Sequence, residues 1–430
     1  MIYRWIVLLA CTILSIGTSL ADPPESNKIT QDLRDLSGLS GSIRMGAWNS
    51  SRNLDDHTNL VNSAVWLQAN PKLSSDFRLY IDGYLSRQDL SSQSDNSDNK
   101  QNVLREAYVD ARFGLLDARV GKQIIVWGRA DRFNPTDNLT PRNFTLLTVE
   151  DDDQHLGTPA VNLNYRSGST SVSAVWLSDF QGNTIPIDRR TAGVTVLNES
   201  VSDGYRQAAI KLDHTGESLD WSASFYSGYD QNPDLSPSII RSTEIVISLR
   251  NNRIKVFGLD AATTTGRYGF RTEFAYTVTE DNDGSNPFVK NSYIYGVVGV
   301  ERVLGETLSV NLQYLGRYVI DYHTLDEITD PVLRAIASIQ ATISNQRARY
   351  SDGITVRVSE RWFHQTLDTE LSGIYLFDQG DYALRLKIGY AIDDRWRVFV
   401  GTDVFRGDPD SFYGRLRDNS TYFAQLNLIF

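Results

Sequence analysis

The last nine residues of the chain form the pattern that most restricts its fold. Apolar or small side chains recur there at every second position, at Tyr422, Ala424, Leu426, Leu428 and Phe430. The positions between them are mostly polar and hold Phe423, Gln425 and Asn427. A strand with one apolar and one polar face is typical of a barrel whose outside meets lipid and whose inside meets water. The alternative is the last strand of a soluble β-sandwich.

The first residues have the organisation of a secretory signal. Arg4 supplies a positive charge, an apolar run covers 5–20, and the small residues Ser19 and Ala21 precede an acidic, proline-containing stretch. We therefore expect a signal peptide at 1–21 cleaved after Ala21, a periplasmic N-terminal segment at 22–38 and a barrel at 39–430. Cys11 is the only cysteine, so the mature chain would contain no disulfide and no cysteine metal site.

Composition narrows the class of protein further. The formal net charge of the chain is −11, which argues against nucleic acid as a partner. No apolar run after residue 21 is long enough for a membrane-spanning helix. The chain is nevertheless rich in aromatic residues, with 21 Tyr and 17 Phe. Abundant aromatic residues in a mildly polar chain fit a membrane barrel with a polar lumen and polar loops, and predict location in the outer membrane.

The alternation predicts an all-β fold, a transmembrane antiparallel up-and-down β-barrel of about 18 strands. Short turns rich in Gly, Pro, Asn and Asp alternate with long polar loops, which places both termini in the periplasm. The expected strands cover 39–49, 58–69, 75–86, 102–113, 115–127, 157–166, 169–180, 203–214, 217–229, 253–263, 267–280, 288–302, 305–319, 347–360, 366–377, 381–392, 395–406 and 419–430.

Three segments need separate interpretation. The strand-like stretch 243–252 would make the strand number odd, so we expect a loop hairpin or an extension above the membrane there, and 16 strands is the alternative count. Apolar residues at helical spacing in 324–345, with an early Pro331, predict one short helix in a long loop. This helix could fold into the lumen or cap the rim of the barrel.

Tryptophan positions suggest two aromatic girdles at the membrane interfaces. Each tryptophan of the mature chain falls near the end of an expected strand. The external group is Trp48, Trp127 and Trp176, and the periplasmic group is Trp66, Trp221, Trp362 and Trp396.

The polar face of each strand should point into the lumen, because a charge facing lipid at mid-membrane costs about 2–4 kcal/mol. The basic side chains predicted to line the lumen are Arg44, Arg78, Arg112, Arg119, Lys211, Arg271, Arg317, Arg357, Arg385, Lys387 and Arg397. The acidic ones are Asp82, Glu106, Asp110, Asp117, Asp213, Glu273, Glu370 and Asp403. Such a wall could favour anionic or zwitterionic solutes, or its charges could simply neutralise one another.

The sequence offers little for catalysis or metal binding. No Gly-x-Ser-x-Gly, His-x-x-x-His or phosphate-loop motif occurs, so we expect no enzyme and no cofactor. The acidic run Glu150, Asp151, Asp152 and Asp153 is a weak calcium candidate and is more typical of a solvated loop.

Several stretches resemble porin-like outer-membrane barrels, including alginate-export-type channels. They are Leu104–Val109, Arg119–Gln123 with Val126–Gly128, and Gly401–Gly407 with Phe412–Gly414. The ending is also similar to the C-terminal strand that the barrel assembly machinery recognises, with Tyr422, Leu426, Leu428 and Phe430 as the assembly signal. The resemblance covers the first third and the last thirty residues.

These observations predict a passive outer-membrane channel for small polar solutes. Its other expected partners are outer-membrane lipid, lipopolysaccharide and the barrel assembly machinery. Two alternatives stay open: an export pore for polysaccharide, and a surface enzyme or adhesin on a plugged barrel.

Overall fold

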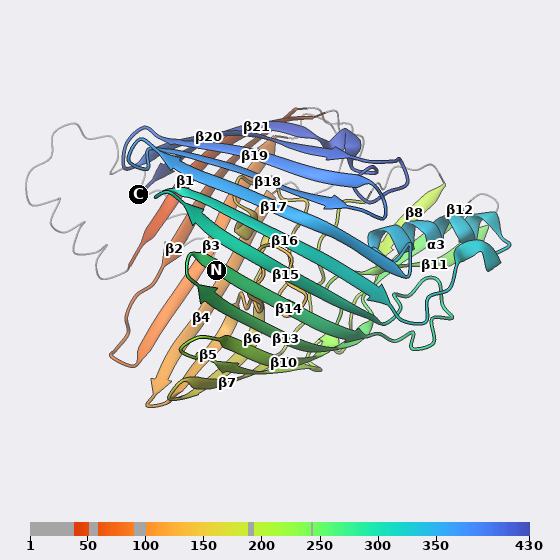
Figure 1. The fold of residues 1–430 in the computed structure, drawn as a ribbon, viewed down its shortest axis with the longest axis horizontal. Coiled ribbons are helices and arrows are strands. Elements are labelled where there is room, and N and C mark those ends of the chain that lie inside the picture. The colour runs from red at the N-terminus through yellow and green to blue at the C-terminus, as the bar shows by residue number, and fades with distance from the viewer. Residues whose placement is uncertain (1–37, 51–58, 90–99, 188–192, 242–243) are drawn as a thin grey trace, which may run out of the picture.

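The computed structural model describes residues 38–50, 59–89, 100–187, 193–241 and 244–430. The expected signal peptide and almost all of the expected periplasmic segment, up to residue 37, lie outside these residues. Within the described part of the chain, eighteen antiparallel strands form one closed barrel (Figure 1). These strands are β1 (Ser40–Ser50), β2 (Asn59–Ala69), β3 (Phe77–Asp89), β4 (Lys100–Phe113), β5 (Leu116–Gln123), β6 (Thr158–Ser167), β7 (Thr170–Leu177), β9 (Gln207–His214), β10 (Asp220–Tyr229), β13 (Arg253–Thr265), β14 (Tyr268–Val278), β15 (Tyr293–Leu304), β16 (Leu308–Val319), β17 (Tyr350–Trp362), β18 (Leu367–Leu376), β19 (Asp381–Ala391), β20 (Trp396–Arg406) and β21 (Thr421–Ile429).

The last strand closes the barrel by pairing with the first. β1 and β21 run antiparallel from Ser42 opposite Ile429 to Ser50 opposite Thr421. One step further, the Gly41 and Phe430 backbones exchange two N–H···O hydrogen bonds of 3.0 Å. Closure removes the unpaired strand edges that an open sheet would leave. The predicted count of 18 strands is therefore confirmed, and the alternative of 16 is wrong.

The two ends of the barrel differ in their connections. Tight turns join the strands at the end where β1 begins and β21 ends, which we name the turn end. Gly114 and Gly168 adopt φ of 62° and 59° in two of these turns, a conformation that costs glycine little. Longer connections gather at the opposite end, the loop end, on the right of Figure 1.

A small subdomain stands at the loop end. It combines a three-stranded sheet, β8 (Val194–Asn198), β11 (Asp234–Arg241) and β12 (Glu244–Arg250), with the helix α3 (Pro331–Ile343). The predicted hairpin around 243–252 corresponds to β11 and β12, whereas β8, which pairs parallel with β12, was not predicted. The side chain of Asp330 accepts hydrogen bonds from the N–H groups of Val332 and Leu333 and so caps α3.

Packing of α3 decides between its two predicted positions. Ile336 is buried with Leu235, Ile247 and Leu249 of the three-stranded sheet, and Figure 1 shows the helix beside that sheet at the loop end. The helix therefore caps the rim and does not cross the lumen. No helix of the described residues is long and apolar enough to span a membrane.

Alternation along the strands separates an apolar outer face from a polar inner face. On β16 the side chain of Leu312 is 44% exposed, whereas the neighbouring Gln313 is 1% exposed. Phe270, Phe274 and Leu386 are exposed in the same way on other strands. An apolar belt on the outside is what lipid requires of a barrel.

This face pattern predicts a depth-dependent penalty for a charge on β16. Leu312→Arg, near the strand centre, should lower the free energy of unfolding by about 2–4 kcal/mol, whereas Tyr318→Arg, on the same face at the loop end, should cost about 0–1 kcal/mol. Urea unfolding in lipid vesicles measures the free energy of unfolding of both variants and of the wild type. Equal penalties at the two positions would contradict the lipid-facing assignment.

Candidate functional site

The connection between β5 and β6, residues 124–157, folds into the barrel, and we name it the constriction loop. Its ion pairs reach widely separated strands of the wall. Arg129 contacts Asp260 on β13, Asp131 contacts Arg357 on β17, and Asp153 contacts Arg44 on β1. Although this loop joins two strands at the loop end, it folds inward because it carries charges complementary to those of the wall.

Apolar side chains of the constriction loop pack on the inner wall in three sectors. Trp127 and Leu139 join a cluster with residues of β6 to β14. Phe133 packs against the cluster that contains Leu315 of β16. Val149 is buried with residues from both sides of the closing strand pair, namely Trp48, Leu60 and Phe423. The loop is thus held by burial as well as by charge.

These contacts explain why part of the tryptophan prediction is wrong. Trp176, Trp221, Trp362 and Trp396 are exposed on the outside, as expected for girdles. Trp48, Trp66 and Trp127 are buried inside the barrel, where two of them pack against the constriction loop and the third belongs to it. Alternation carried a signal for Trp48, because this residue shares a strand face with Arg44, which was predicted to line the lumen.

Glu273 of β14 fixes the start of the constriction loop. It is fully buried and accepts hydrogen bonds from the N–H groups of Arg129, Ala130 and Thr136 at 3.0, 3.1 and 2.7 Å, and from the Thr136 hydroxyl at 2.8 Å. Gly128 approaches so closely that an added Cβ would lie 2.6 Å from a Glu273 carboxylate oxygen. Glu273, which was predicted to line the lumen, therefore holds the backbone of residues 129–136 in place.

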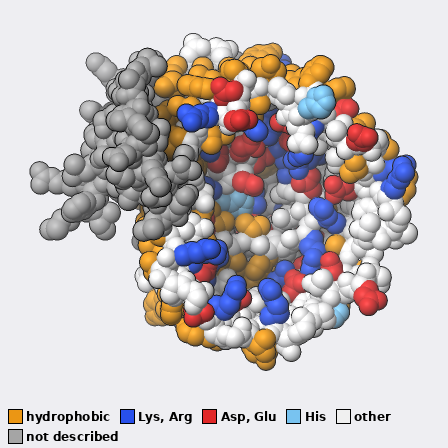
Figure 2. Space-filling view, turned by 90° about the vertical axis from the view of Figure 1, so that its left-hand side faces the viewer, with side chains coloured by type: hydrophobic (Ala, Val, Ile, Leu, Met, Phe, Trp, Pro, Cys, Tyr) orange, Lys and Arg blue, Asp and Glu red, His pale blue; other side chains and the backbone are white. Residues whose placement is uncertain are grey.

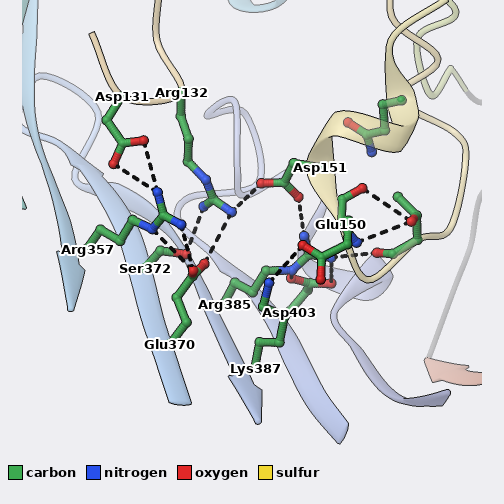
Figure 3. Close-up of polar contacts among 12 residues, drawn as sticks. Asp131, Arg132, Glu150, Asp151, Arg357, Glu370, Ser372, Arg385, Lys387 and Asp403 are labelled. Carbon is green, nitrogen blue, oxygen red and sulfur yellow. Dashed lines mark hydrogen bonds and ion pairs between the residues drawn. The ribbon is translucent and has the colours of Figure 1, made fainter. Parts of the chain in front are cut away.

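A track of alternating charges runs from the constriction loop to β17 and β18 (Figure 3). Arg357 lies between two carboxylates, with N–O distances of 3.2 Å to Asp131 and 2.8 Å to Glu370. Arg132 extends toward Glu370 at 3.9 Å and forms an ion pair with Asp151. Each guanidinium therefore joins a loop carboxylate to a wall carboxylate.

The track continues on β19 and β20. Arg385 forms ion pairs with Asp151 of the loop and, at 2.8 Å, with Asp403 of the wall. Lys387 contacts Glu150 at 3.0 Å, and Figure 3 shows both basic side chains reaching toward the loop. Both side chains of the Arg385–Asp403 pair are largely shielded from solvent, so this pair is stronger than a surface ion pair, whereas Glu150 is half exposed in its pair with Lys387.

Most carboxylates of the acidic run 150–153 are engaged in ion pairs with basic side chains. Glu150, Asp151 and Asp153 each pair with a basic side chain. Among the described residues, no group of three His, Cys, Asp or Glu side chains is arranged to hold a metal ion. The run thus serves as the acidic half of an ion-pair network in this structure.

The remaining predicted lumen residues divide into three groups. Some pair within the wall or with the loop: Arg112 with Asp117, Arg119 with Asp110, Lys211 and Arg129 with Asp213, Arg271 with Glu301, and Asp82 with Arg105. Glu106 accepts a hydrogen bond from the Ile124 N–H at 2.8 Å. For Arg78, Arg317 and Arg397, no ion pair is found within the described part of the chain; Arg78 and Arg397 are exposed near the turn end.

Arg105 is a lumen residue that alternation missed. A bulge at Asp82 and Gly83 leaves Arg105 without a partner in the β3–β4 register, which turns its side chain inward. It contacts Asp82 at 2.9 Å and donates hydrogen bonds to the backbone carbonyls of Asp152 and His155. Strict alternation places this arginine toward lipid, and the cost of that position was a signal for the bulge.

Asp137 and His155 of the constriction loop have shifted pKa values. Burial raises the pKa of Asp137 to about 6, although Arg142 at 3.0 Å opposes the shift. Burial lowers the pKa of His155 to about 4, and the positive charges of Arg142 and Arg105 lower it further. His155 is therefore neutral at physiological pH, and its neutral form is part of the packed loop.

A cavity of about 2350 Å³ remains beside the loop. Seen from the turn end, the barrel is hollow and its interior shows many acidic and basic side chains (Figure 2). Eleven basic and nine acidic residues line the cavity. Apolar residues line it too, among them Phe144, which is 42% exposed, Pro186 and Ile339. A polar solute would therefore meet both paired charges and an apolar surface.

Comparisons with solved structures agree with this architecture. OccK5 (OpdH) of Pseudomonas aeruginosa aligns with a TM-score of 0.53 and 11% identity, covering 91% of this chain and 98% of that one. A mutant of a Rhodopseudomonas blastica porin aligns at 0.43 and 11% identity, over 91% and 99% of the chains. A loop-deletion mutant of the Vibrio cholerae outer membrane protein OmpT aligns at 0.43 and 13%, over 91% and 98%. No protein-family model and no curated protein matches the sequence. The likeness to OccK5 shows a shared barrel fold.

The ion pairs predict that Arg385→Gln loosens the constriction loop. The change leaves Asp403 and Asp151 without their shared cation, and should lower the free energy of unfolding by about 2–3 kcal/mol once solvent access to Asp151 is allowed for. Hydrogen exchange over 128–156 should accelerate. The control Arg361→Gln removes an exposed pair with Asp368 and should change stability by at most about 0.5 kcal/mol. Unchanged exchange in Arg385→Gln would refute the anchoring role.

The lowered pKa of His155 predicts how the free energy of unfolding depends on pH. Because its pKa is lower in the folded protein than in the unfolded chain, its contribution to stability is complete above pH 6.5 and is lost as pH falls toward 4. From pH 7.5 to pH 5, wild type should lose about 2 kcal/mol more than His155→Gln in vesicle unfolding experiments. A parallel pH dependence of the two proteins would show that His155 protonates freely in the fold.

Proposed function

We propose that the protein is an outer-membrane channel through which small polar solutes, anionic or zwitterionic, diffuse passively. The observation that carries this proposal is the cavity of about 2350 Å³ lined by a charged constriction loop inside a closed barrel. A barrel of eighteen strands is wide enough to hold both a folded-in loop and an aqueous path. Transport of this kind needs no cofactor, because wall charge and the width of the constriction set selectivity.

The proposed orientation of the barrel in the membrane follows from the lengths of the connections at its two ends. In the proposed function, the turn end faces the periplasm, the loop end with α3 faces the exterior, and residues 1–21 are removed after Ala21. The hydrogen-bonded pair of Phe430 and Gly41 would form as the assembly machinery joins the last strand to the first. The proposed partners are therefore this machinery, the surrounding lipid and lipopolysaccharide, and the solute.

A weak preference for anions follows from the small excess of bases around the cavity. Most charges are already paired, so neither sign dominates the path. Arg317 contributes to the excess: its guanidinium lies 4.6 Å and 4.8 Å from the ring centroids of Tyr293 and Tyr295, and no carboxylate pairs with it among the described residues. The same saturation of charges argues against catalysis, which needs a nucleophile or base that is free to react.

Planar-bilayer recording tests the proposal. Purified, folded protein should conduct, and a salt gradient should give a reversal potential with a weak anion preference. Lys387→Glu places two carboxylates where Lys387 now neutralises Glu150 and should shift the reversal potential toward cations. The charge-swapped control, Lys387→Glu with Glu150→Lys, should return it toward the wild-type value. Absence of conductance from folded protein would refute the channel.

A further inference from the structure

Basic side chains gather on the outside of the barrel at the loop end. Arg206 precedes β9 on the same face as the exposed Ile210. Arg253 and Lys255 of β13 share the outward face with Phe257, which is exposed. Since β9, β10 and β13 are neighbours in the barrel, these cations form one surface patch. With Arg250 at the end of β12, we name it the outer-rim cationic patch.

Contacts within the patch hold its parts together and leave it positively charged. The Arg253 guanidinium donates a hydrogen bond of 3.0 Å to the backbone carbonyl of Arg206. Asp203 lies 3.2 Å from Arg206 and 3.9 Å from Arg253, and Glu280 lies 4.0 Å from Arg250. Arg206, Arg253 and Arg250 thus share two carboxylates, and Lys255 pairs with neither of them.

Solvent and ligands can reach these cations. The side chain of Arg206 is 63% exposed and that of Arg250 is 56% exposed. Lys255 is exposed as well, and it forms no ion pair with any residue that the structure describes. The uncompensated charge is therefore available to an anion on the outer surface.

Aromatic side chains mark the level of the membrane at which the patch lies. Trp176 and Tyr205 are exposed beside Arg206, and the Trp176 ring N–H donates a hydrogen bond of 2.8 Å to the Tyr205 carbonyl. On the adjacent strands Phe257 and Tyr276 are exposed and stack at 6.3 Å. Exposed tryptophan and tyrosine belts lie at the headgroup level of a bilayer, so the cations stand among the headgroups.

We propose that the outer-rim cationic patch binds the phosphate groups of a phosphorylated glycolipid in the outer leaflet. This inference rests on the outer-membrane location in the proposed function. Guanidinium groups bind phosphate through paired, charge-assisted hydrogen bonds, and clustered basic residues at a membrane surface attract anionic headgroups. Acyl chains of the lipid would lie along the apolar face below, where Phe257 and Leu259 are exposed.

Native mass spectrometry of the purified full chain in detergent tests the site. The probes are bisphosphorylated lipid A and its enzymatically dephosphorylated form. Wild type should retain the bisphosphorylated lipid, and the Arg206→Gln, Lys255→Gln double variant should retain at least tenfold less. Neither residue lies in the lumen, so bilayer conductance should be unchanged, which separates this result from any failure of the channel proposal.

The turn end supplies a matched control. Lys72→Gln with Arg361→Gln removes two exposed cations from the opposite rim and should leave lipid retention at the wild-type level. Three outcomes would overturn the proposal: equal retention by the outer-rim and control variants, equal retention of the dephosphorylated lipid, or complete displacement by millimolar inorganic phosphate. The last result would mean that the patch binds free phosphate rather than a lipid headgroup.

Discussion

The structure depends on the need to neutralise charges that lipid cannot accept. Alternation sends most charged residues of the strands inward, where a buried charge without a partner is costly. The constriction loop supplies the missing partners in both signs. Its carboxylates meet Arg357, Arg385 and Lys387 of the wall, and its Arg129 meets Asp260 and Asp213. Loop and wall therefore determine each other's position.

This complementarity changes the expected electrostatics of the lumen. Separate sectors of unpaired basic and acidic side chains on opposite walls would create a transverse field across the lumen. In the structure Asp82 pairs with Arg105, Asp110 with Arg119, and the basic sector with the loop's carboxylates. Charges are balanced locally, so the field along the path is weaker than separated sectors would create.

The fold was predictable because its signals are local and repeated. Period-two alternation identifies the eighteen strands, turns rich in Gly, Pro, Asn or Asp separate most of them at the turn end, and the helix around Pro331 follows from apolar spacing. The path of the constriction loop has no such signal, because residues 124–157 have no period and find their partners far away in the sequence. Two other residues did carry signals: Trp48 shares a strand face with Arg44, and the cost of placing Arg105 toward lipid pointed to a bulge.

Anchoring from several sides makes the constriction a fixed element of the lumen. Moving the loop away from the wall would expose Glu273 without the backbone donors of Thr136 and Ala130, and would also separate Asp151 from Arg385. Breaking even one buried pair costs several kcal/mol, so displacement of the whole loop is strongly opposed. In the proposed channel, solutes would therefore pass beside the loop, along the cavity that is lined by its charged side chains and by the apolar Phe144.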